Sequence, residues 1–209
     1  QALIRLNIIP RDQHCISRKN ISDSALKVMS RLRSSGYQAY LVGGAVRDLF
    51  LGGHPKDFDI ATDPTPEAVT DLFRNSRIIG RRFRIVHVRF GREIIEVTTF
   101  RGHHDNGLGE NGQHEEGGNH SRQSASGLLL RDNVYGTLAE DAARRDLTVN
   151  ALYYDAGKFE VFDHVHGLQD LKKRSVCIIG DPGQRYTEDP VRMLRVVRFA
   201  AKLGFSIDQ

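Results

Sequence analysis

The spacing of apolar residues along the chain switches between a helical period and a strand-like period, and these switches predict a mixed α+β fold. Helical spacing predicts helices at residues 22–36, 45–51, 67–74 and 137–144, and again from residue 167 onward. Short apolar runs predict a strand at residues 40–42, a second strand that carries Asp57 and Asp59, and further strands at 85–90, 94–100 and 159–163, of which 85–90 and 94–100 are expected to form a hairpin. Ser22 or Asp23 can cap the first helix, and Thr137 with Glu140 forms a capping-box pattern at the start of the helix at 137–144. We therefore expect a sheet with helices packed on it.

Changes in the periodicity of apolar residues divide the chain into three regions. Residues 1–19 show no sustained period and are interpreted as an N-terminal arm, residues 20–163 carry the predicted strands, and residues 164–209 turn helical. Within the middle region, residues 101–127 are dominated by Gly, Asn, His, Ser and Glu. So polar a segment cannot bury enough apolar surface to offset the entropy of ordering it, so we expect a mobile loop there. Its four histidines are not interpreted as a metal site.

A stretch rich in glycine and aspartate, LVGGAVRDLFLGGHPKDFDIAT, concentrates the candidate chemistry. Gly43 and Gly44 lie between a strand and a helix, where a backbone without Cβ atoms can approach a phosphate, and Arg47 adds a cation. Asp57 and Asp59 are two residues apart, so their carboxylates share one face of a strand. The pair is tolerable if one carboxyl keeps its proton, if both are solvated, or if a divalent cation such as magnesium sits between them. The structural alternatives are a tight connection and a solvated strand end.

A third carboxylate can join this pair from the strand EIIEVTTF. Glu93 and Glu96 are three residues apart and face opposite ways on a regular strand, so only one of them can face the aspartates.

Two later segments carry side chains that suit a nucleotide. RRDLTVNAL supplies cations, a carboxylate and, at Asn150, a donor and acceptor suited to a ribose hydroxyl. EDPVRMLRVVR has a proline near a helix start, acidic residues before it and arginines three apart, which by spacing alone is an amphipathic helix with a compensated dipole. Asp189 and Arg192 can also hydrogen-bond a base edge, and Arg195 can contact a phosphate.

Composition favours a polyanionic partner. The 209 residues carry a formal charge of +4, and arginine supplies 23 of the 30 basic residues. Arginine binds phosphates and base edges through a planar fork, so the bias points toward nucleotides or nucleic acid. No apolar run approaches the length of a membrane span and no secretory signal is visible, so we expect a cytoplasmic protein. Cys15 and Cys177 are interpreted as reduced thiols.

Gly-Gly-x-x-Arg-Asp followed by Asp-x-Asp resembles the core of the polymerase-beta-like nucleotidyltransferases. The wording VGGAVRD and KDFDIAT resembles their class II branch, which contains tRNA CCA-adding enzymes and bacterial poly(A) polymerases. The likeness covers most of the chain from about Asn20 onward. It implies a nucleotidyltransferase head with a small mixed β-sheet flanked by helices, followed by the start of an all-helical neck.

The resemblance also implies residue roles in a two-metal transfer of a nucleotide from ATP to an RNA 3′ end. Asp57 and Asp59 hold two magnesium ions, and Glu96 completes one of these sites. Asp146 could orient an arginine or act as a further active-site carboxylate, and its role is left open between these two alternatives. Nucleotide binding is implied for the following residues: Gly43, Gly44, Arg47, Arg144, Arg145, Asn150, Asp189, Arg192 and Arg195.

The segment IIGRRFRIVHV bears on which branch the chain represents. It closely resembles the pattern that distinguishes bacterial poly(A) polymerases, so we expect repeated addition of AMP to RNA, with His87 as a packed strand residue. A tRNA CCA-adding enzyme is the alternative. A small-molecule nucleotidyltransferase is disfavoured by RRDLTVN and EDPVR, and a non-catalytic RNA-binding module is disfavoured by the intact carboxylate pair.

Overall fold

The computed structural model describes residues 6–81, 83–102, 122–123, 129–131 and 134–208. Within these residues the main sheet contains the following strands: β1 Asn7–Ile9, β2 Ala39–Val42, β3 Asp59–Thr62, β4 Ser76–Ile79, β5 Ile85–Phe90, β6 Glu93–Thr99, β9 Leu152–Asp155 and β10 Glu160–Asp163. Their order across the sheet is β1-β10-β9-β2-β3-β6-β5-β4. β3 and β6 are parallel and the other neighbours are antiparallel, so the expected mixed sheet is confirmed.

The helices lie in the predicted helical regions, with ends that differ from the predicted ones by at most two residues in the first four. They are α1 Asp23–Ser34, α2 Gly44–Phe50, α3 Pro66–Leu72, α4 Leu138–Arg144, α5 Gly167–Lys173, α6 Pro182–Glu188 and α7 Val191–Leu203, with single 3₁₀ turns η1 Arg11–Gln13, η2 Arg18–Asn20 and η3 Thr148–Asn150. Two short pairs of strands complete the described elements: β7 Arg122–Gln123 with β8 Leu129–Arg131, and β11 Ser175–Val176 with β12 Ser206–Ile207. No helix in the described ranges is long and apolar enough to cross a membrane.

Local signals in the sequence account for where the helices begin and end. The Ser22 hydroxyl accepts the Ala25 N–H at 3.1 Å and caps α1. Gly36 follows the helix with φ +88°, a conformation that favours glycine. At α4, Thr137 and Glu140 form the predicted reciprocal capping box.

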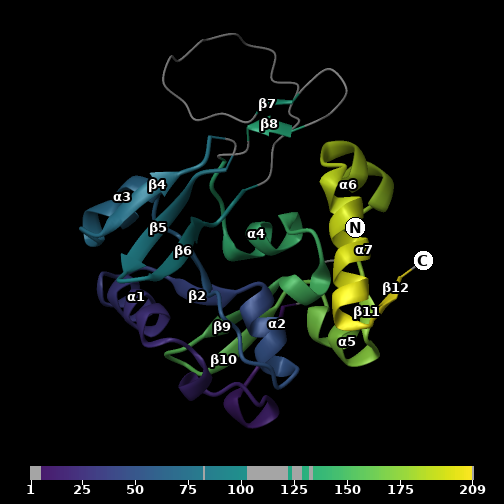
Figure 1. Cartoon of the computed structure of the whole chain (residues 1–209), viewed down its shortest axis with the longest axis horizontal. Helices are drawn as coiled ribbons and strands as arrows, with labels where there is room; N and C mark the ends of the chain where they lie inside the picture. Colours follow the sequence, from purple (N-terminus) through teal and green to yellow (C-terminus); the bar gives the residue numbers. More distant parts are fainter. Residues whose placement is uncertain (1–5, 82, 103–121, 124–128, 132–133, 209) are drawn as a thin grey trace.

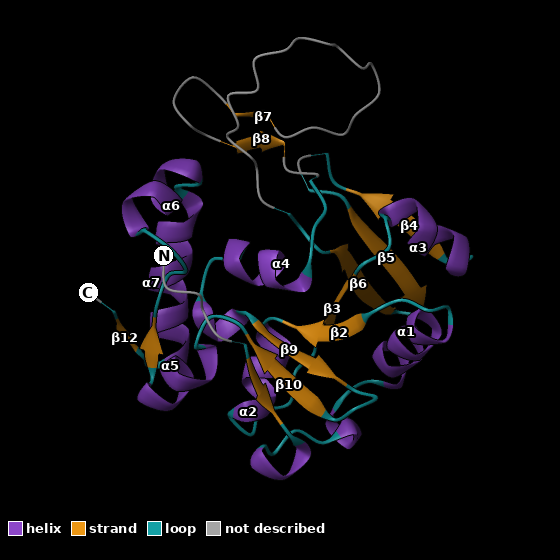
Figure 2. Ribbon diagram, turned by 180° about the vertical axis from the view of Figure 1, so that it is seen from behind, coloured by secondary structure: helices purple, strands orange, loops and turns teal. Residues whose placement is uncertain are grey.

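The helices cover the two faces of the sheet unequally. α1 packs against β2, β3 and β6, and α3 packs against β4, β5 and β6, so both cover the same face (Figure 1). Val28 on α1 and the sheet residues Val88 and Ile95, on β5 and β6, are all fully buried in the apolar core. Figures 1 and 2 show α4 over the other face, with α6 and α7 beside it. We call the face under α1 and α3 the covered face, and the opposite one the open face.

The register aligns polar residues across the open face. Asp59 on β3 is paired with Glu96 on β6, Glu96 with His87 on β5, and His87 with Arg77 on β4. Because side chains alternate along each strand, these four lie in one row, while the residues before and after them point to the covered face. The pairing of β3 with β6 therefore brings two carboxylates together from positions 37 residues apart in the chain.

Several regions differ from the sequence-based expectations. The segment interpreted as an arm contains β1, which pairs with β10, and Ile9 and Ile16 from this segment are buried in the core. The region expected to be entirely helical includes the small parallel sheet of β11 and β12. β3 begins at Asp59, so Asp57 precedes the strand. Most of the expected mobile loop, residues 103–121 and 124–127, lies outside the described residues.

Candidate active site

The predicted site residues line two adjoining cavities on the open face. One cavity, of about 170 Å³, is lined by Val42, Asp59, Phe83, Glu96, Thr98, Arg101, Asp141, Arg144, Arg145, Asp189 and Arg192. The other, of about 500 Å³, contains the remaining predicted residues, which are Gly43, Gly44, Arg47, Asp57, Asp146, Asn150 and Arg195. Asp59 and Arg145 line both cavities. We call the first the inner cavity and the second the outer cavity.

The carboxylates at the junction are in an unfavourable environment for negative charge. Burial, together with the charges of Glu96 and Asp57, raises the pKa of Asp59 from 3.8 to about 6, although Arg145 acts in the opposite direction. Asp57 is exposed, whereas Asp59 and Glu96 are half-buried. A cation bound at this junction would relieve the repulsion.

The donor set fits magnesium. In the described part of the chain, no three His, Cys, Asp or Glu side chains converge closely enough to form a complete metal-binding cluster. Magnesium does not require one, because it usually takes one or two carboxylates and fills its other positions with water and substrate phosphate oxygens. Asp59 and Glu96, with Asp57 beside them, offer only oxygen atoms of this kind.

The glycine turn lies directly against the carboxylates. Gly43 has φ +77°, and a Cβ atom built on it would lie 3.6 Å from Oδ2 of Asp59. An L side chain is therefore disfavoured by backbone conformation, and its Cβ atom would be in van der Waals contact with the carboxylate. Gly44 begins α2 and packs against the Arg47 guanidinium, 3.3 Å from the position of a Cβ atom.

Arg47 links three elements and has little exposed surface. Its side chain is 2% exposed; it donates to Asp48 at 2.7–2.8 Å and to Oδ1 of Asn150 at 2.6 Å. Its guanidinium also lies 5.1 Å from the ring centre of Phe199 on α7. The structure therefore shows Arg47 and Asn150 engaged with each other, a geometry in which they shape the wall of the outer cavity.

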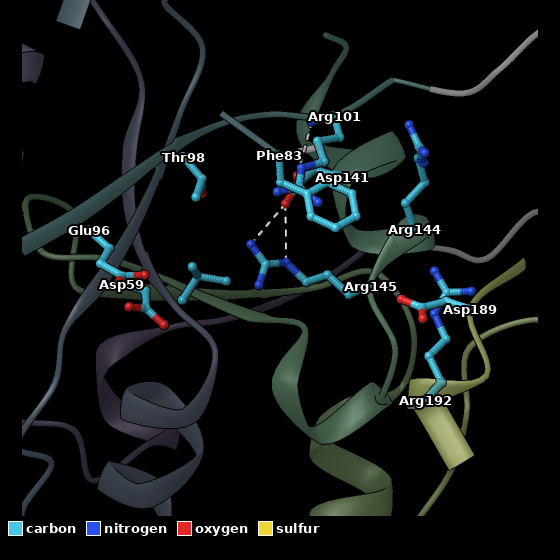
Figure 3. Close-up of a pocket in the computed structure, with 11 residues that line it drawn as sticks. Asp59, Phe83, Glu96, Thr98, Arg101, Asp141, Arg144, Arg145, Asp189 and Arg192 are labelled. Carbon is cyan, nitrogen blue, oxygen red and sulfur yellow. Dashed lines mark hydrogen bonds and ion pairs between the residues drawn. The ribbon is translucent and has the colours of Figure 1, made fainter. Parts of the chain in front are cut away.

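Arg145 is held in place by two residues that the sequence interpretation did not select. Asp141 Oδ2 accepts hydrogen bonds from Nε of Arg145 at 3.1 Å and from the Tyr153 hydroxyl at 2.6 Å, and the backbone N–H of Arg101 donates to Oδ1 at 3.0 Å. Asp141 is 5% exposed and Tyr153 is fully buried. In Figure 3 the Arg145 guanidinium points into the cavity between the Asp59–Glu96 pair and the Asp189–Arg192 pair.

The network orients a cation toward the carboxylates. Burial acts to lower the pKa of Arg145, but Tyr153 and Asp141 more than offset it, so Arg145 stays charged. The spacing of Asp141 and Arg145, four residues apart at the end of a helix, is a signal that could have identified the pair. Nothing in the sequence signals the contact with Tyr153, because it depends on how β9 lies beneath α4.

The N-terminal end of α7 is organised by a second network, whose side chains are half-buried. Arg192 donates from Nη1 to Glu188 at 2.9 Å and to the Arg185 carbonyl at 3.0 Å. Arg185 donates to the carbonyls of Arg144 and Arg145, at 2.6 and 2.5 Å, and so joins α6 to the end of α4. Arg185 and Glu188 were not selected from the sequence, although their spacing from each other and from Arg192 fits ion pairs on a helix.

Asp146 has a partner on α7. Its Oδ2 accepts from Nε of Arg195 at 2.5 Å, and its Oδ1 accepts the Leu147 backbone N–H at 2.8 Å. Both side chains line the outer cavity. Asp146 therefore orients an arginine, which is one of the two alternatives that the sequence left open.

These geometries agree with a family match. A family model described as the poly A polymerase head domain matches residues 39–177. The chain belongs to this family. The matched range includes the glycine turn, the three carboxylates and the Asp141–Arg145–Tyr153 network, whereas Asp189, Arg192 and Arg195 lie after it.

Individual relatives fall into two groups. Poly(A) polymerase I of Escherichia coli O6:H1 is 57% identical over 99% of this chain, and a CCA-adding enzyme of Bacillus pumilus is 38% identical over 88%. The chain also matches a solved structure, the crystal structure of the Bacillus stearothermophilus CCA-adding enzyme in complex with CTP, with a TM-score of 0.68 and 33% identity. The match covers 88% of this chain and 40% of the chain of that enzyme. The chain spans 43% and 41% of the length of the two curated relatives.

Proposed function

We propose that this chain is the catalytic head of an RNA nucleotidyltransferase that adds AMP from ATP to RNA 3′ ends without a template. The observation that carries the proposal is convergence. Thirteen residues from four separated segments were selected from the sequence, and all thirteen line two adjoining cavities that meet at Asp59 and Arg145.

In the proposed reaction the RNA 3′ hydroxyl releases its proton to solvent and its oxygen bonds to the α-phosphorus of ATP. The bond from the α-phosphorus to the oxygen that bridges it to the β-phosphorus breaks, and pyrophosphate leaves. Asp57, Asp59 and Glu96 would hold magnesium, which when bound activates the hydroxyl and neutralises charge on the phosphates. Arg145, fixed by Asp141, contributes a charged donor beside the transferred phosphoryl group. The Gly43 turn lets the triphosphate approach the carboxylates closely.

Nucleotide choice is assigned to the opposite side of the inner cavity. Asp189 and Arg192 would contact the base edge there, and the bonds from Arg192 to Glu188 and the Arg185 carbonyl fix its orientation. Arg144 and Arg195 supply further cations along the cavities. Asn150 and Arg47 would act mainly as wall residues that position this machinery.

Two observations favour repeated addition of AMP over the addition of cytidine and adenosine by a CCA-adding enzyme. Identity to the E. coli poly(A) polymerase I is 57%, against 38% to the B. pumilus CCA-adding enzyme. In addition, Phe83 from the distinctive IIGRRFRIVHV segment lines the inner cavity beside Arg101, whose guanidinium lies 4.4 Å from its ring centre.

The carboxylate assignment has a direct test on β6. We expect Glu96→Gln to lower ATP- and RNA-dependent pyrophosphate release at least about 100-fold, because it removes a charge that holds the cation and phosphates in the transition state. Glu93→Gln is the matched control. Glu93 is two residues before Ile95 and four before Val97 on the same strand, so its side chain is on the covered face with theirs. Equal activity of the two variants would remove Glu96 from the mechanism.

A further inference from the structure

A third cavity lies at the sheet edge beyond the carboxylates. It has a volume of about 540 Å³, and its walls include Arg74, Arg77, His87, Arg89 and Ile94. None of its lining residues is acidic. We call this cavity the edge groove.

The arginines of the edge groove differ from those of the active site in having no partners. In the described part of the chain, the guanidinium groups of Arg74, Arg77 and Arg89 make no ion pair or hydrogen bond, and all three side chains are exposed. Arg145 and Arg192, by contrast, are each held by a carboxylate. Three unpaired cations around one groove leave a positive potential that suits a polyanion.

A row of neighbouring side chains across the open face connects the edge groove to the active site. Arg77 is paired with His87, Nε2 of His87 lies 3.2 Å from Oε1 of Glu96, and Glu96 is paired with Asp59. Three steps between neighbouring strands separate Arg77 from Asp59, about 14 Å at the usual strand spacing. A chain molecule lying in the groove would therefore reach the carboxylates with its end.

We propose that the edge groove binds the phosphates of the RNA strand just upstream of its 3′ end, so that the strand crosses β4 and β5 and its terminal hydroxyl lies beside Glu96. The proposal rests on the proposed function for the identity of the polyanion. It gives the RNA and ATP separate cationic surfaces: the strand meets exposed arginines that have no side-chain partner in the described part of the chain, and the triphosphate meets arginines fixed by carboxylates. Ile94, which is 38% exposed, adds an apolar contact for a base.

The test compares two sets of charge substitutions. In the first, Arg74, Arg77 and Arg89 are all changed to Gln; in the control, Lys19, Lys27 and Arg31 are changed to Gln, which removes the same charge from exposed positions near and on α1. Affinity for a labelled single-stranded oligoribonucleotide is measured by anisotropy across a salt series without divalent cations. The KM values for RNA and for ATP are then measured with magnesium.

Loss of three phosphate contacts to a single strand should weaken RNA binding about 100-fold at 0.1 M salt and reduce the slope of log affinity against log salt by about 2. The KM for RNA should rise while the KM for ATP stays unchanged, and the control set should change neither. If the triple variant does not fold, each single Gln variant should weaken binding about 5-fold.

Three results would overturn the proposal: absence of RNA binding by the unsubstituted chain, equal RNA affinity of the two triple variants, or a rise in the KM for ATP as large as that for RNA. The proposed function fails separately. If the unsubstituted chain binds RNA through the edge groove but releases no pyrophosphate with ATP, the groove stands and the assigned reaction falls. If the groove variant incorporates AMP with the same KM for RNA as the unsubstituted chain, the assigned reaction stands and the groove proposal falls.

Discussion

The two faces of the sheet are formed by the same strands, but one face packs in the apolar core and the other lines the cavities. On the covered face, Val86, Val88, Ile95 and Val97 pack under α1 and α3 with at most 1% exposure. On the open face the same strands present charged and polar side chains to a set of cavities. Because consecutive residues of a strand alternate between faces, substitutions one residue apart should separate stability from function. The predictions below use such neighbouring residues where the chain offers them.

Removing either aspartate should have the largest effect on the reaction. We expect Asp57→Asn and Asp59→Asn each to abolish AMP incorporation into RNA, because each removes a charge that the cation and the transferred phosphoryl group require. RNA affinity, measured without magnesium, should be retained because the edge groove is intact. Incorporation at near-normal rate by either variant would contradict the assignment of the carboxylates.

On the covered face the expected effect is on stability alone. Ile95→Ala should lower the free energy of unfolding by about 2–5 kcal/mol, since it leaves a cavity in a fully packed position. Its neighbour Ile94 is 38% exposed on the open face, so Ile94→Ala should change stability by less than about 0.5 kcal/mol. Urea unfolding of the two variants measures both values. Similar losses would mean that the two faces are not distinct in packing.

Asp59→Asn should also stabilise the protein when no divalent cation is present. The pKa of Asp59 is raised on folding from 3.8 to about 6, so the folded state holds its proton more tightly than the unfolded chain does. The unsubstituted protein therefore loses stability as pH rises from about 4 to 6, and the variant lacks this loss. At pH 7 the variant should be more stable by about 1–3 kcal/mol, and at pH 3.5 the difference should vanish. Thermal unfolding in chelator across this pH range tests the sign.

Two adjacent tyrosines on β9 provide the finest comparison. Tyr153 faces α4 and shares its hydroxyl with Asp141 and Arg145, whereas the buried hydroxyl of Tyr154 has no hydrogen-bond partner in the described part of the chain. Tyr153→Phe should cost about 1–2 kcal/mol of stability and raise the KM for ATP through a less ordered Arg145. Tyr154→Phe should be neutral or slightly stabilising, because it removes an unsatisfied group. A larger loss of stability in Tyr154→Phe than in Tyr153→Phe would contradict the assignment of Tyr153 to the network with Asp141 and Arg145.

Local signals made much of this fold predictable. The caps at Ser22 and Thr137, the hairpin of β5 and β6, and the glycine turn before α2 depend on residues close together in the sequence, and the structure has them where the sequence indicated. The candidate site residues could be selected from the sequence for the same reason, since they occur in short motifs. The parity of β6 indicated that only one of Glu93 and Glu96 could face the aspartates, and the family resemblance selected Glu96.

What could not be predicted depends on contacts between distant segments. β1 has three residues and only Ile9 among them is buried, so it shows no period, and its pairing with β10 is visible only in the fold. The engagement of Arg47 with Asn150, 103 residues away, is equally long-range. Motifs identified Arg47 as a cation near phosphate, but they could not indicate that each of its three guanidinium nitrogens already has a side-chain partner.

Product length with separate triphosphates tests the central claim most directly. An unrelated single-stranded RNA primer is incubated with magnesium and ATP, CTP, GTP or UTP alone, and a tRNA that lacks its terminal CCA is incubated with CTP and ATP together. Both reactions use this chain and a version extended to the full length of its relatives. Repeated addition of AMP predicts long ladders with ATP and little product with CTP. Addition that stops after two cytidines and one adenosine, confined to tRNA, would contradict the account and identify a CCA-adding activity.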